Sequence, residues 1–339
     1  MNFKKYIVPV LAVILVVSIF LISLFGGKPK EATASGFAMG SPVNITVYGV
    51  KNGEGICLSA IDRVKEIDKN YLSHTLSNSA VFLLNKNRQV ECDQWFVDYM
   101  TKCMELSAKY DSFTLFSGGF KSLWKIEDGG YVPNSDEIAK VLAECQASSL
   151  NISGKTITLS GGNLDLGALG KGSACDEAIS YLKSQGVENA LVTVGGTVGV
   201  IGKPQGKESF GIGVRNPFGS QNDYFAILNL SDCFISTSGD YEKYFEKDGV
   251  RFSHIFDAKT GSPVQNDLTS VTVVAESGML SDFLSTLIYI EGVEKGFEIA
   301  KHFNAEIIVI KKDKSVLVSK NLNDKLTIQD DSFSVSVIE

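Results

Sequence analysis

The segment Leu164–Gly172, which reads LDLGALGKG, constrains the structure of this chain more than any other stretch. It places an apolar run, the carboxylate of Asp165, three glycines and Lys171 within nine residues. The residues that follow carry apolar side chains with the spacing of one helical face: Ala174, Ala178, Tyr181 and Leu182. The sequence therefore predicts a glycine-rich turn that opens a helix, with Gly186 as the glycine that ends it.

A glycine-rich turn at a helix start presents free backbone N–H groups and the positive end of the helix dipole to a ligand. Lys171 would add a positive charge, and Asp165 would accept a hydrogen bond from a hydroxyl or amine of the same ligand. The spacing matches neither the Walker pattern nor the dinucleotide-binding glycine pattern. An anion-binding loop and an ordinary strand–turn–helix junction both remain open at this point.

The N-terminal region contains an uninterrupted apolar segment. Tyr6–Phe25 is twenty residues long without a charge and follows Lys4 and Lys5, which is long enough to cross a bilayer core of ~30 Å. A secretory signal peptide has a shorter apolar region, and cleavage at the small residues Ala32–Ala34 would leave almost no linker before the first strand. We expect an uncleaved single-pass anchor and linker over residues 1–34, with a signal peptide as the alternative, and an extracytoplasmic domain.

Blocks of short strands and helices follow the apolar segment. Strand patterns include Pro42–Gly49 and Ala190–Val194, and helical patterns include Ile56–Tyr71 and Asp93–Tyr110. This irregular order predicts an α+β fold, in one domain over residues 35–339. The net charge of −7 argues against a nucleic-acid-binding surface, because no basic stripe is available to neutralise phosphates.

The six cysteines include no C-x-x-C pair, so the sequence lacks the ligand spacing of a zinc site. Cys57, Cys103 and Cys175 lie in helical patterns, where a buried thiol behaves as a small apolar residue. We expect most of the cysteines to be reduced.

Two later segments carry residues suited to chemistry. Asp282 and Thr286 are spaced i, i+4 on a predicted helix and therefore share one face. Two oxygens at that spacing suit a hard cation such as Mg²⁺. The alternative is a first-turn carboxylate favoured by the helix dipole and a packed hydroxyl. His254 lies in a segment with Asp257 and a turn, and is either a base or a hydrogen-bonded structural histidine.

The order of these motifs along the chain is more specific than any one of them. In sequence and spacing, the region from Phe37 to Gly292 resembles the ApbE family of FAD:protein FMN transferases. The matching motifs, in chain order, are Met39-Gly40-Ser41, Leu84-Asn85, LDLGALGKGSACD from Leu164, VGG from Val194, ISTSGDY from Ile235, HIFDAKTG from His254 and SDFLST from Ser281.

The resemblance implies an α+β fold related to the T-fold and a Mg²⁺-dependent reaction. Proteins of this family split FAD at its pyrophosphate and attach FMN through a phosphoester to a Thr or Ser of an acceptor protein, such as a subunit of a redox complex. They act outside the cytoplasmic membrane, and some members instead hydrolyse FAD to FMN and AMP.

The resemblance also assigns roles to residues of this sequence. Met39 would contact FAD, and Asp165 would bind its adenine side. The metal would be held by the backbone carbonyl of Ala168 and the side chains of Asp282 and Thr286. The flavin pocket would be lined by His254, Ile255 and Phe256. The remaining expected ligand-binding positions are Lys171, Gly195, Gly196, Ser238 and Gly239, and the expected catalytic group comprises His254, Asp257 and Lys171.

Five positions depart from the family pattern. Thr75 stands where an aromatic residue is common, and Thr197 follows Gly-Gly in place of an acid or amide. In the family's F-D-x-T pattern, Thr114 replaces the Asp and Phe116 the Thr, and further along Ala258 replaces a Pro. These departures keep two alternatives to a protein flavin transferase in view. One is a pyrophosphatase that releases free FMN, and the other is a protein that binds flavin without turnover.

Overall fold

The computed structural model describes residues 31–339, and a nine-stranded sheet runs through the molecule. Its strand order is β1-β2-β6-β7-β10-β15-β16-β17-β19, and neighbouring strands are antiparallel except for the final pair β17 and β19. The strands of this sheet are β1 (Ala32–Ala38), β2 (Ser41–Val47), β6 (Ala190–Val194), β7 (Thr197–Ile201), β10 (Cys233–Gly239), β15 (Leu268–Ala275), β16 (Glu306–Lys311), β17 (Ser315–Ser319) and β19 (Ser334–Ile338).

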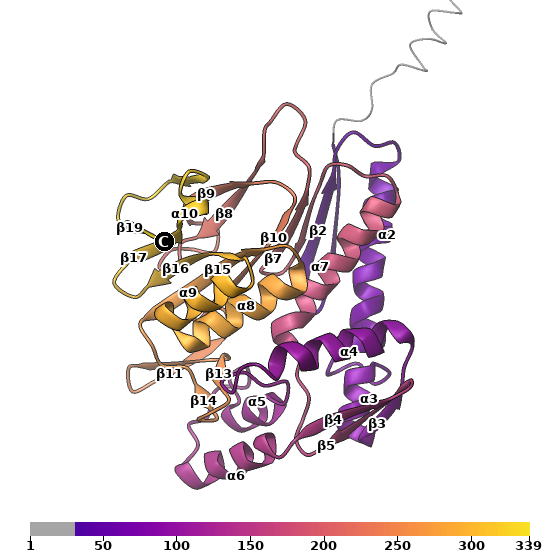
Figure 1. Ribbon diagram of the computed structural model, residues 1–339, viewed down its shortest axis with the longest axis vertical. Helices are drawn as coiled ribbons and strands as arrows, with labels where there is room; N and C mark the ends of the chain where they lie inside the picture. The colour runs from indigo at the N-terminus through magenta and orange to yellow at the C-terminus, as the bar shows by residue number, and fades with distance from the viewer. Residues whose placement is uncertain (1–30) are drawn as a thin grey trace, which may run out of the picture.

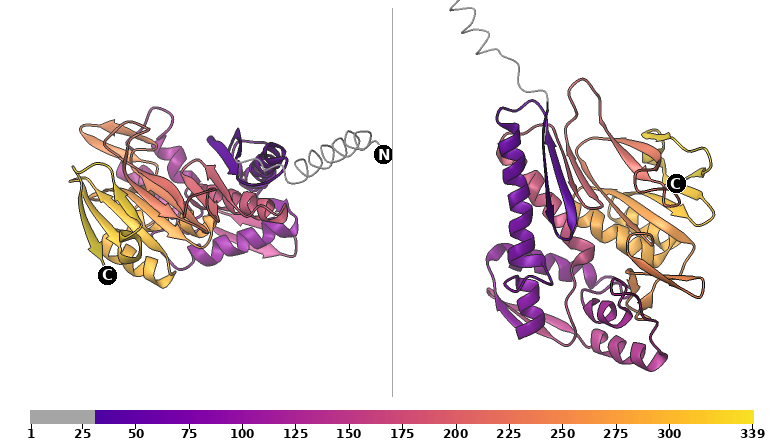
Figure 2. Two further views of the ribbon diagram at one scale, coloured as in Figure 1. Left: turned by 90° about the horizontal axis from the view of Figure 1, so that it is seen from above. Right: turned by 180° about the vertical axis from the view of Figure 1, so that it is seen from behind.

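Helices cover one face of this sheet and a smaller sheet covers the other (Figure 1). In the view from behind in Figure 2, strands of the large sheet lie in front of α7 and α8. The helices are α2 (Gly53–Ile67), the π-helical turn η1 (Asp68–Leu72), α3 (Ala80–Asn87), α4 (Gln94–Ser107), α5 (Gly118–Trp124), α6 (Ser135–Gln146), α7 (Gly167–Ser184), α8 (Gly278–Glu291), α9 (Val293–His302) and α10 (Lys320–Asn323).

The smaller sheets extend this framework. They are β18-β9-β8, made of β8 (Phe210–Arg215), β9 (Tyr224–Leu230) and β18 (Leu326–Ile328), and β3-β5-β4, made of β3 (Gln89–Glu91), β4 (Ser149–Ser153) and β5 (Thr156–Ser160). Two hairpins complete the strands: β11 (Tyr244–Lys247) with β12 (Val250–Ser253), and β13 (Phe256–Asp257) with β14 (Ser262–Pro263).

Alternating side chains of the central strands explain this layering. On β15, Val271 and Val273 pack into the cluster under α8 and α9, whereas Val274 packs into the cluster under the β18-β9-β8 sheet. Because successive side chains point to opposite faces, a strand covered on both sides must be apolar throughout. All of β15 is accordingly buried.

The α+β class is confirmed, and several local expectations need correction. β1 was not expected, and it begins at Ala32, inside the segment assigned to the anchor and linker. The α6 helix is capped by Asn134, whose side chain forms a capping box with Glu137. The α8 helix begins at Gly278, so Asp282 lies beyond its first turn.

The described part of the chain contains no helix that is long and apolar enough to span a membrane. The expected anchor at Tyr6–Phe25 lies outside the described residues. The six cysteines are free, and the three expected in helices are fully buried in α2, α4 and α7.

Candidate active site

Two tight turns at one end of the large sheet bring predicted ligand-binding residues together. The β1–β2 turn contains Met39 and Gly40, and the β6–β7 turn contains Gly195 and Gly196. A β-carbon built on Gly195 would lie 3.2 Å from Cδ of Lys171. The α7 lysine therefore lies against the β6–β7 turn, and Gly195 leaves space for its side chain.

Met39 is held in an unusual conformation. Its φ is 54°, in the left-handed region that non-glycine residues rarely adopt. Its backbone N–H donates to Oδ2 of Asp68 at 2.7 Å, and Asp68 begins the π-helical turn η1. Its side chain reaches α7, where a β-carbon on Gly170 would lie 3.1 Å from its Cε. Asp68 thus fixes the turn that presents Met39 to the start of α7.

The segment between β5 and α7, residues 161–166, is called the Asp165 loop, and it contains an ion pair that no motif predicted. Oδ2 of Asp165 lies 2.7 Å from Nζ of Lys121 on α5, and Oδ1 accepts a hydrogen bond from the N–H of Gly167 at 2.8 Å. Burial alone would raise the pKa of the Asp165 carboxyl, but the Lys121 ammonium and the Gly167 N–H lower this pKa to about 2. Asp165 is therefore an anion at any physiological pH.

Asp282, one of the expected metal ligands, lies where α7 crosses α8. Oδ2 of Asp282 accepts a hydrogen bond from the N–H of Gly172 at 3.0 Å. An α-helical carbonyl points toward the residue four positions later, so the carbonyl of Ala168 lies beside this same N–H group. Thr286 lies one turn after Asp282 on α8 and accepts or donates a hydrogen bond to Ser238 at 3.1 Å. Asp282 thus lies against the first turns of α7, and Thr286 lies one turn further along α8, beside Ser238 of β10.

These donors fit a magnesium ion. Asp282 is only 5% exposed, and no salt bridge within residues 31–339 balances its charge. One carboxylate, a hydroxyl and a backbone carbonyl form an oxygen set of the kind that Mg²⁺ uses together with water and substrate phosphates. Within the same range, no cluster of three or more His, Cys, Asp or Glu side chains offers a competing metal site.

The helix crossing depends on two glycines. A β-carbon on Gly172 would lie 2.0 Å from the carbonyl oxygen of Gly278, and one on Gly278 would lie 2.3 Å from the carbonyl oxygen of Gly172. The backbones of α7 and α8 can approach this closely only because both residues lack a side chain. Asp176 locks the contact, because its carboxylate accepts the N–H groups of Gly278 and Met279 at 2.6 and 2.8 Å.

A line of buried hydroxyls supports α8 from the sheet. Thr197 is 0% exposed and shares a hydrogen bond of 3.0 Å with Ser236, which shares one of 2.8 Å with Ser281. Ser281 precedes Asp282 on α8. The departure at Thr197 is therefore part of a closed hydroxyl chain, in which a charged side chain would lack a balancing charge.

His254 lies half-buried between lysines. Burial, followed by the positive charges of Lys121, Lys171 and Lys243, lowers the pKa of His254 to about 4. Nδ1 lies 3.3 Å from the carbonyl oxygen of Lys243. Because a carbonyl can only accept, Nδ1 must carry the proton, and Nε2 keeps its lone pair. The residue is thus a neutral imidazole with a free acceptor nitrogen.

The other residues of the HIFD segment lie deeper or face elsewhere. Ile255 and Phe256 are buried in two apolar clusters, where Phe256 packs with Phe120 of α5. Asp257 accepts the N–H of Lys259 at 2.8 Å and so stabilises its own turn. The structure brings His254 and Lys171 to the Asp165 loop but gives the Asp257 carboxylate this local role.

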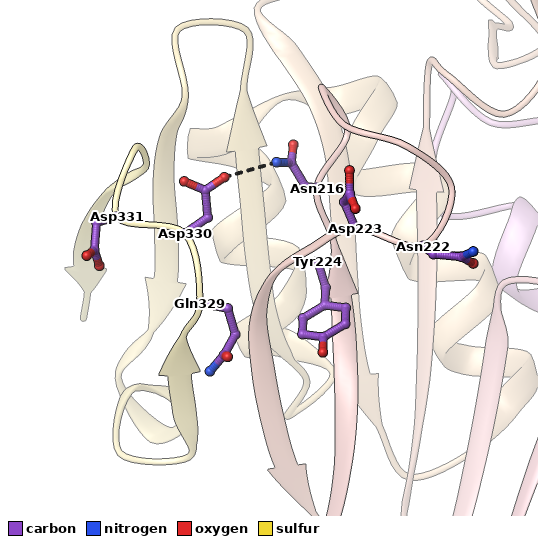
Figure 3. A pocket seen from close by; sticks show the side chains of 7 residues that line it. All are labelled: Asn216, Asn222, Asp223, Tyr224, Gln329, Asp330 and Asp331. Atoms are coloured by element: carbon purple, nitrogen blue, oxygen red, sulfur yellow. Dashed lines mark hydrogen bonds between the residues drawn. The ribbon is translucent and has the colours of Figure 1, made fainter.

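A pocket of about 530 Å³ lies away from these residues, beside the β8–β9 loop and the end of β18 (Figure 3). Asn216, Asp223 and Asp330 are among its lining residues, and Asn216 donates to Asp330 at 3.1 Å. The pocket includes none of the predicted site residues.

The motifs and their geometry are those of a known family. The ApbE family model matches residues 39–310. The chain belongs to the ApbE family. The resemblance seen in the sequence is thereby confirmed, and the same family name appears among solved structures of similar fold.

Relatives and structural neighbours of this ApbE-family chain cover most of its length. The FAD:protein FMN transferase of Klebsiella pneumoniae (strain 342) is 28% identical over 311 residues, which span 89% of this chain and 96% of that protein. The crystal structure of the ApbE protein from Thermotoga maritima superposes with a TM-score of 0.79 at 28% identity, covering 87% of this chain and 99% of that one. The flavin transferase ApbE from Vibrio cholerae gives a TM-score of 0.73 at 26% identity, covering 89% and 98%.

Sequence reasoning missed three residues of this ApbE-family site: Asp68, Lys121 and Asp176. Each acts on a partner that is distant in sequence, 29 residues away for Asp68 and 102 for the contact of Asp176 with Gly278. Asp176 stood inside the quoted LDLGALGKGSACD motif, so its acidic side chain was the one available signal. Lys121 and Asp68 carried none.

Proposed function

We propose that this chain is a Mg²⁺-dependent FAD:protein FMN transferase that releases AMP. Relatives named FAD:protein FMN transferase are 25–36% identical to it. The observation that carries the proposal is the contact between Asp282 and Gly172, because it joins the oxygen donors of α8 to the Asp165 loop of α7. Cleavage of a pyrophosphate requires a metal ion held by oxygen donors and positively charged side chains that stabilise negative charge on the phosphate oxygens.

The proposed reaction transfers a phosphoryl group between oxygens. The hydroxyl oxygen of an acceptor Thr or Ser forms a bond to the phosphorus of the FMN half. The bond from that phosphorus to the AMP oxygen breaks, AMP leaves, and the hydroxyl proton passes to a base. Nε2 of His254 is suited to accept it, since its imidazole is neutral and its Nδ1 is held by the Lys243 carbonyl.

Ala168, Asp282 and Thr286 would hold the magnesium ion, which supplies positive charge to the phosphate oxygens. Lys171 lies at the start of α7, where its Nζ donates to the carbonyl of Gly167 at 3.2 Å. It is placed to stabilise negative charge on the donor. Met39 and the Gly195–Gly196 turn would form the wall opposite α7.

The cellular location is proposed from the sequence alone. An apolar anchor at Tyr6–Phe25 would hold the described domain at the outer side of the cytoplasmic membrane. An acceptor there would be an extracytoplasmic or membrane redox protein carrying a flavinylation-type Thr motif.

The test uses the full-length chain in detergent with FAD, Mg²⁺ and a purified acceptor domain. Intact-mass analysis of the acceptor and quantification of AMP are made together. A mass gain equal to an FMN phosphoester, matched by AMP and abolished by EDTA, is expected. Free FMN and AMP with an unmodified acceptor would instead favour the pyrophosphatase, and intact FAD retained on the chain would contradict both enzymatic activities.

A further inference from the structure

Lys121 lies at the point where the donor-binding elements meet, and the helix that carries it is firmly held. The ring of Phe120 packs 5.8 Å from that of Phe256, and Nε1 of Trp124 donates to the carbonyl of Gly261 at 3.0 Å. At the other end, the N–H of Gly118 donates to the carbonyl of Asn163, two residues before Asp165. The helix α5 is therefore fixed between the His254 segment and the Asp165 loop.

Two lysine ammonium groups from different elements converge on Gly167. Nζ of Lys171 donates to its carbonyl oxygen at 3.2 Å, and a β-carbon on Gly167 would lie 3.3 Å from Nζ of Lys121. The same β-carbon would lie 3.0 Å from Oδ1 of Asp165, so a side chain at this position would crowd the ion pair of Lys121 and Asp165. Gly167 therefore leaves the Lys121 ammonium group uncovered on this side.

The charges at this position do not balance. Lys121 and Lys171 contribute two positive charges, and Asp165 contributes one negative charge, which leaves one positive charge in excess. The nearby carboxylate of Glu127 does not compensate, because it pairs with Lys243 at 2.7 Å. His254 is neutral and adds no negative charge, and after burial it is the positive charge of Lys121 that lowers the pKa of its imidazole most. Such an excess in a partly buried site is relieved by an anion.

Lys121 also retains hydrogen-bonding capacity. A lysine ammonium has three N–H donors. Within residues 31–339, the ion pair with Asp165 accounts for one of them, and the side chain of Lys121 is 34% exposed. It can therefore keep Asp165 as a partner and donate to a ligand oxygen at the same time.

We propose that Lys121 is a donor-binding residue that contacts a phosphate oxygen of the nucleotide donor while it remains paired with Asp165. This deepens the proposed function and rests on it, because the phosphate belongs to the FAD that the site would cleave. The phosphate can come from the AMP half or from the FMN half, and the two sources share the chemistry that Lys121 recognises. A purely structural ion pair is the alternative, and it would stabilise the loop without contacting the donor.

The experiment measures binding of AMP, adenosine, FMN and riboflavin to the full-length chain by calorimetry in EDTA. The variants are Lys121→Met, which removes the charge and keeps the chain length, and Lys121→Arg, which keeps the charge. Lys140→Met, an exposed lysine on α6, is the matched control. We expect Lys121→Met to weaken AMP or FMN by roughly tenfold or more, the cost of one hydrogen bond to a charged group.

The affinity for the unphosphorylated compound of the same pair, adenosine for AMP or riboflavin for FMN, should change less than twofold in Lys121→Met. Lys121→Arg should retain most of the affinity for the nucleotide. The affected pair identifies the half of FAD that Lys121 contacts. Equal losses of affinity for the phosphorylated and unphosphorylated compound of each pair, or no loss of affinity at all, would overturn the proposal. The contact of Lys121 with Asp165 would then be a purely structural ion pair. FAD is titrated into the wild-type chain in parallel. Failure to bind FAD would contradict the proposed function itself, which is a separate outcome.

Discussion

At the scale of residues, this site depends on two kinds of side chain. Some would contact the donor, and others accept hydrogen bonds from backbone N–H groups and so fix the turns that carry the first kind. Met39 adopts its left-handed conformation with a carboxylate of Asp68 on its N–H group. We expect Asp68→Ala to weaken FAD binding roughly tenfold, since a charge-assisted hydrogen bond is lost and the turn relaxes. The KM for FAD should rise while kcat changes little.

The control for this prediction is Asp62→Ala, an exposed acid on the preceding helix that pairs with Lys65. A double variant Met39→Ala with Asp68→Ala should be no worse than Met39→Ala alone, because Asp68 acts through Met39. Additive losses would show that Asp68 supports the fold and not the Met39 turn.

His254 gives a pH-dependent prediction. Its pKa of about 4 means that the proton-accepting form is present throughout pH 5–8, so kcat/KM should not fall until the pH approaches 4. In the unfolded chain the histidine pKa is about 6.5, so between pH 4 and 6.5 the unfolded chain binds a proton that the folded chain does not bind. Between these values, His254 therefore lowers the stability of the fold as pH falls.

Lys171→Met removes one of the positive charges that depress this pKa. The pKa of His254, followed by NMR of the imidazole, should move upward, and the acid limb of kcat/KM should move with it. An unchanged His254 pKa in this variant would show that Lys171 lies too far away to act on the base.

At the scale of elements, the crossing of α7 and α8 determines whether the expected metal ligands meet. Gly172→Ala would place a β-carbon against the backbone of Gly278, which cannot move as a flexible side chain would. We expect a loss of about 2–3 kcal/mol in the free energy of unfolding and loss of Mg²⁺-dependent activity. Gly55→Ala on α2 is the control, since its β-carbon would meet only the side chain of Asn52.

Asp176 anchors the same crossing. Asp176→Ala would leave the N–H groups of Gly278 and Met279 without their acceptor, at a cost of roughly 1–3 kcal/mol. Because α8 would then be less firmly placed, the apparent affinity for Mg²⁺ should also fall. Urea unfolding and a magnesium titration of the reaction rate measure the two effects separately. A stability loss with unchanged magnesium affinity would contradict a positioning role.

Prediction from sequence succeeded for elements and failed for their contacts. The i, i+4 pair Asp282 and Thr286 and the glycine-rich start of α7 follow from periodicity, and both lie where expected. The approach of Gly172 to Gly278 depends on how two helices cross, which periodicity cannot specify. The ion pair of Lys121 with Asp165 depends on the docking of α5 for the same reason.

At the scale of the whole molecule, β1 belongs to the catalytic domain. It pairs with β2 along its whole length and leads directly into the Met39 turn. A fragment beginning at Glu31 should therefore bind FAD, whereas one beginning at Ser41 should expose the β2 edge and fail to bind. Equal binding by both fragments, measured by calorimetry, would contradict the role assigned to β1 and its turn.

The proposed magnesium site of this flavin transferase depends above all on Asp282. The most direct test is the rate of FMN transfer to the acceptor as a function of Mg²⁺ concentration, at saturating FAD. The wild type is compared with Asp282→Asn and Thr286→Val, and with Asp313→Asn in the β16–β17 turn as control. We predict a small loss of apparent magnesium affinity for Thr286→Val, near-complete loss of transfer for Asp282→Asn and no change for the control. Wild-type magnesium dependence in Asp282→Asn would show that Asp282 does not hold the metal.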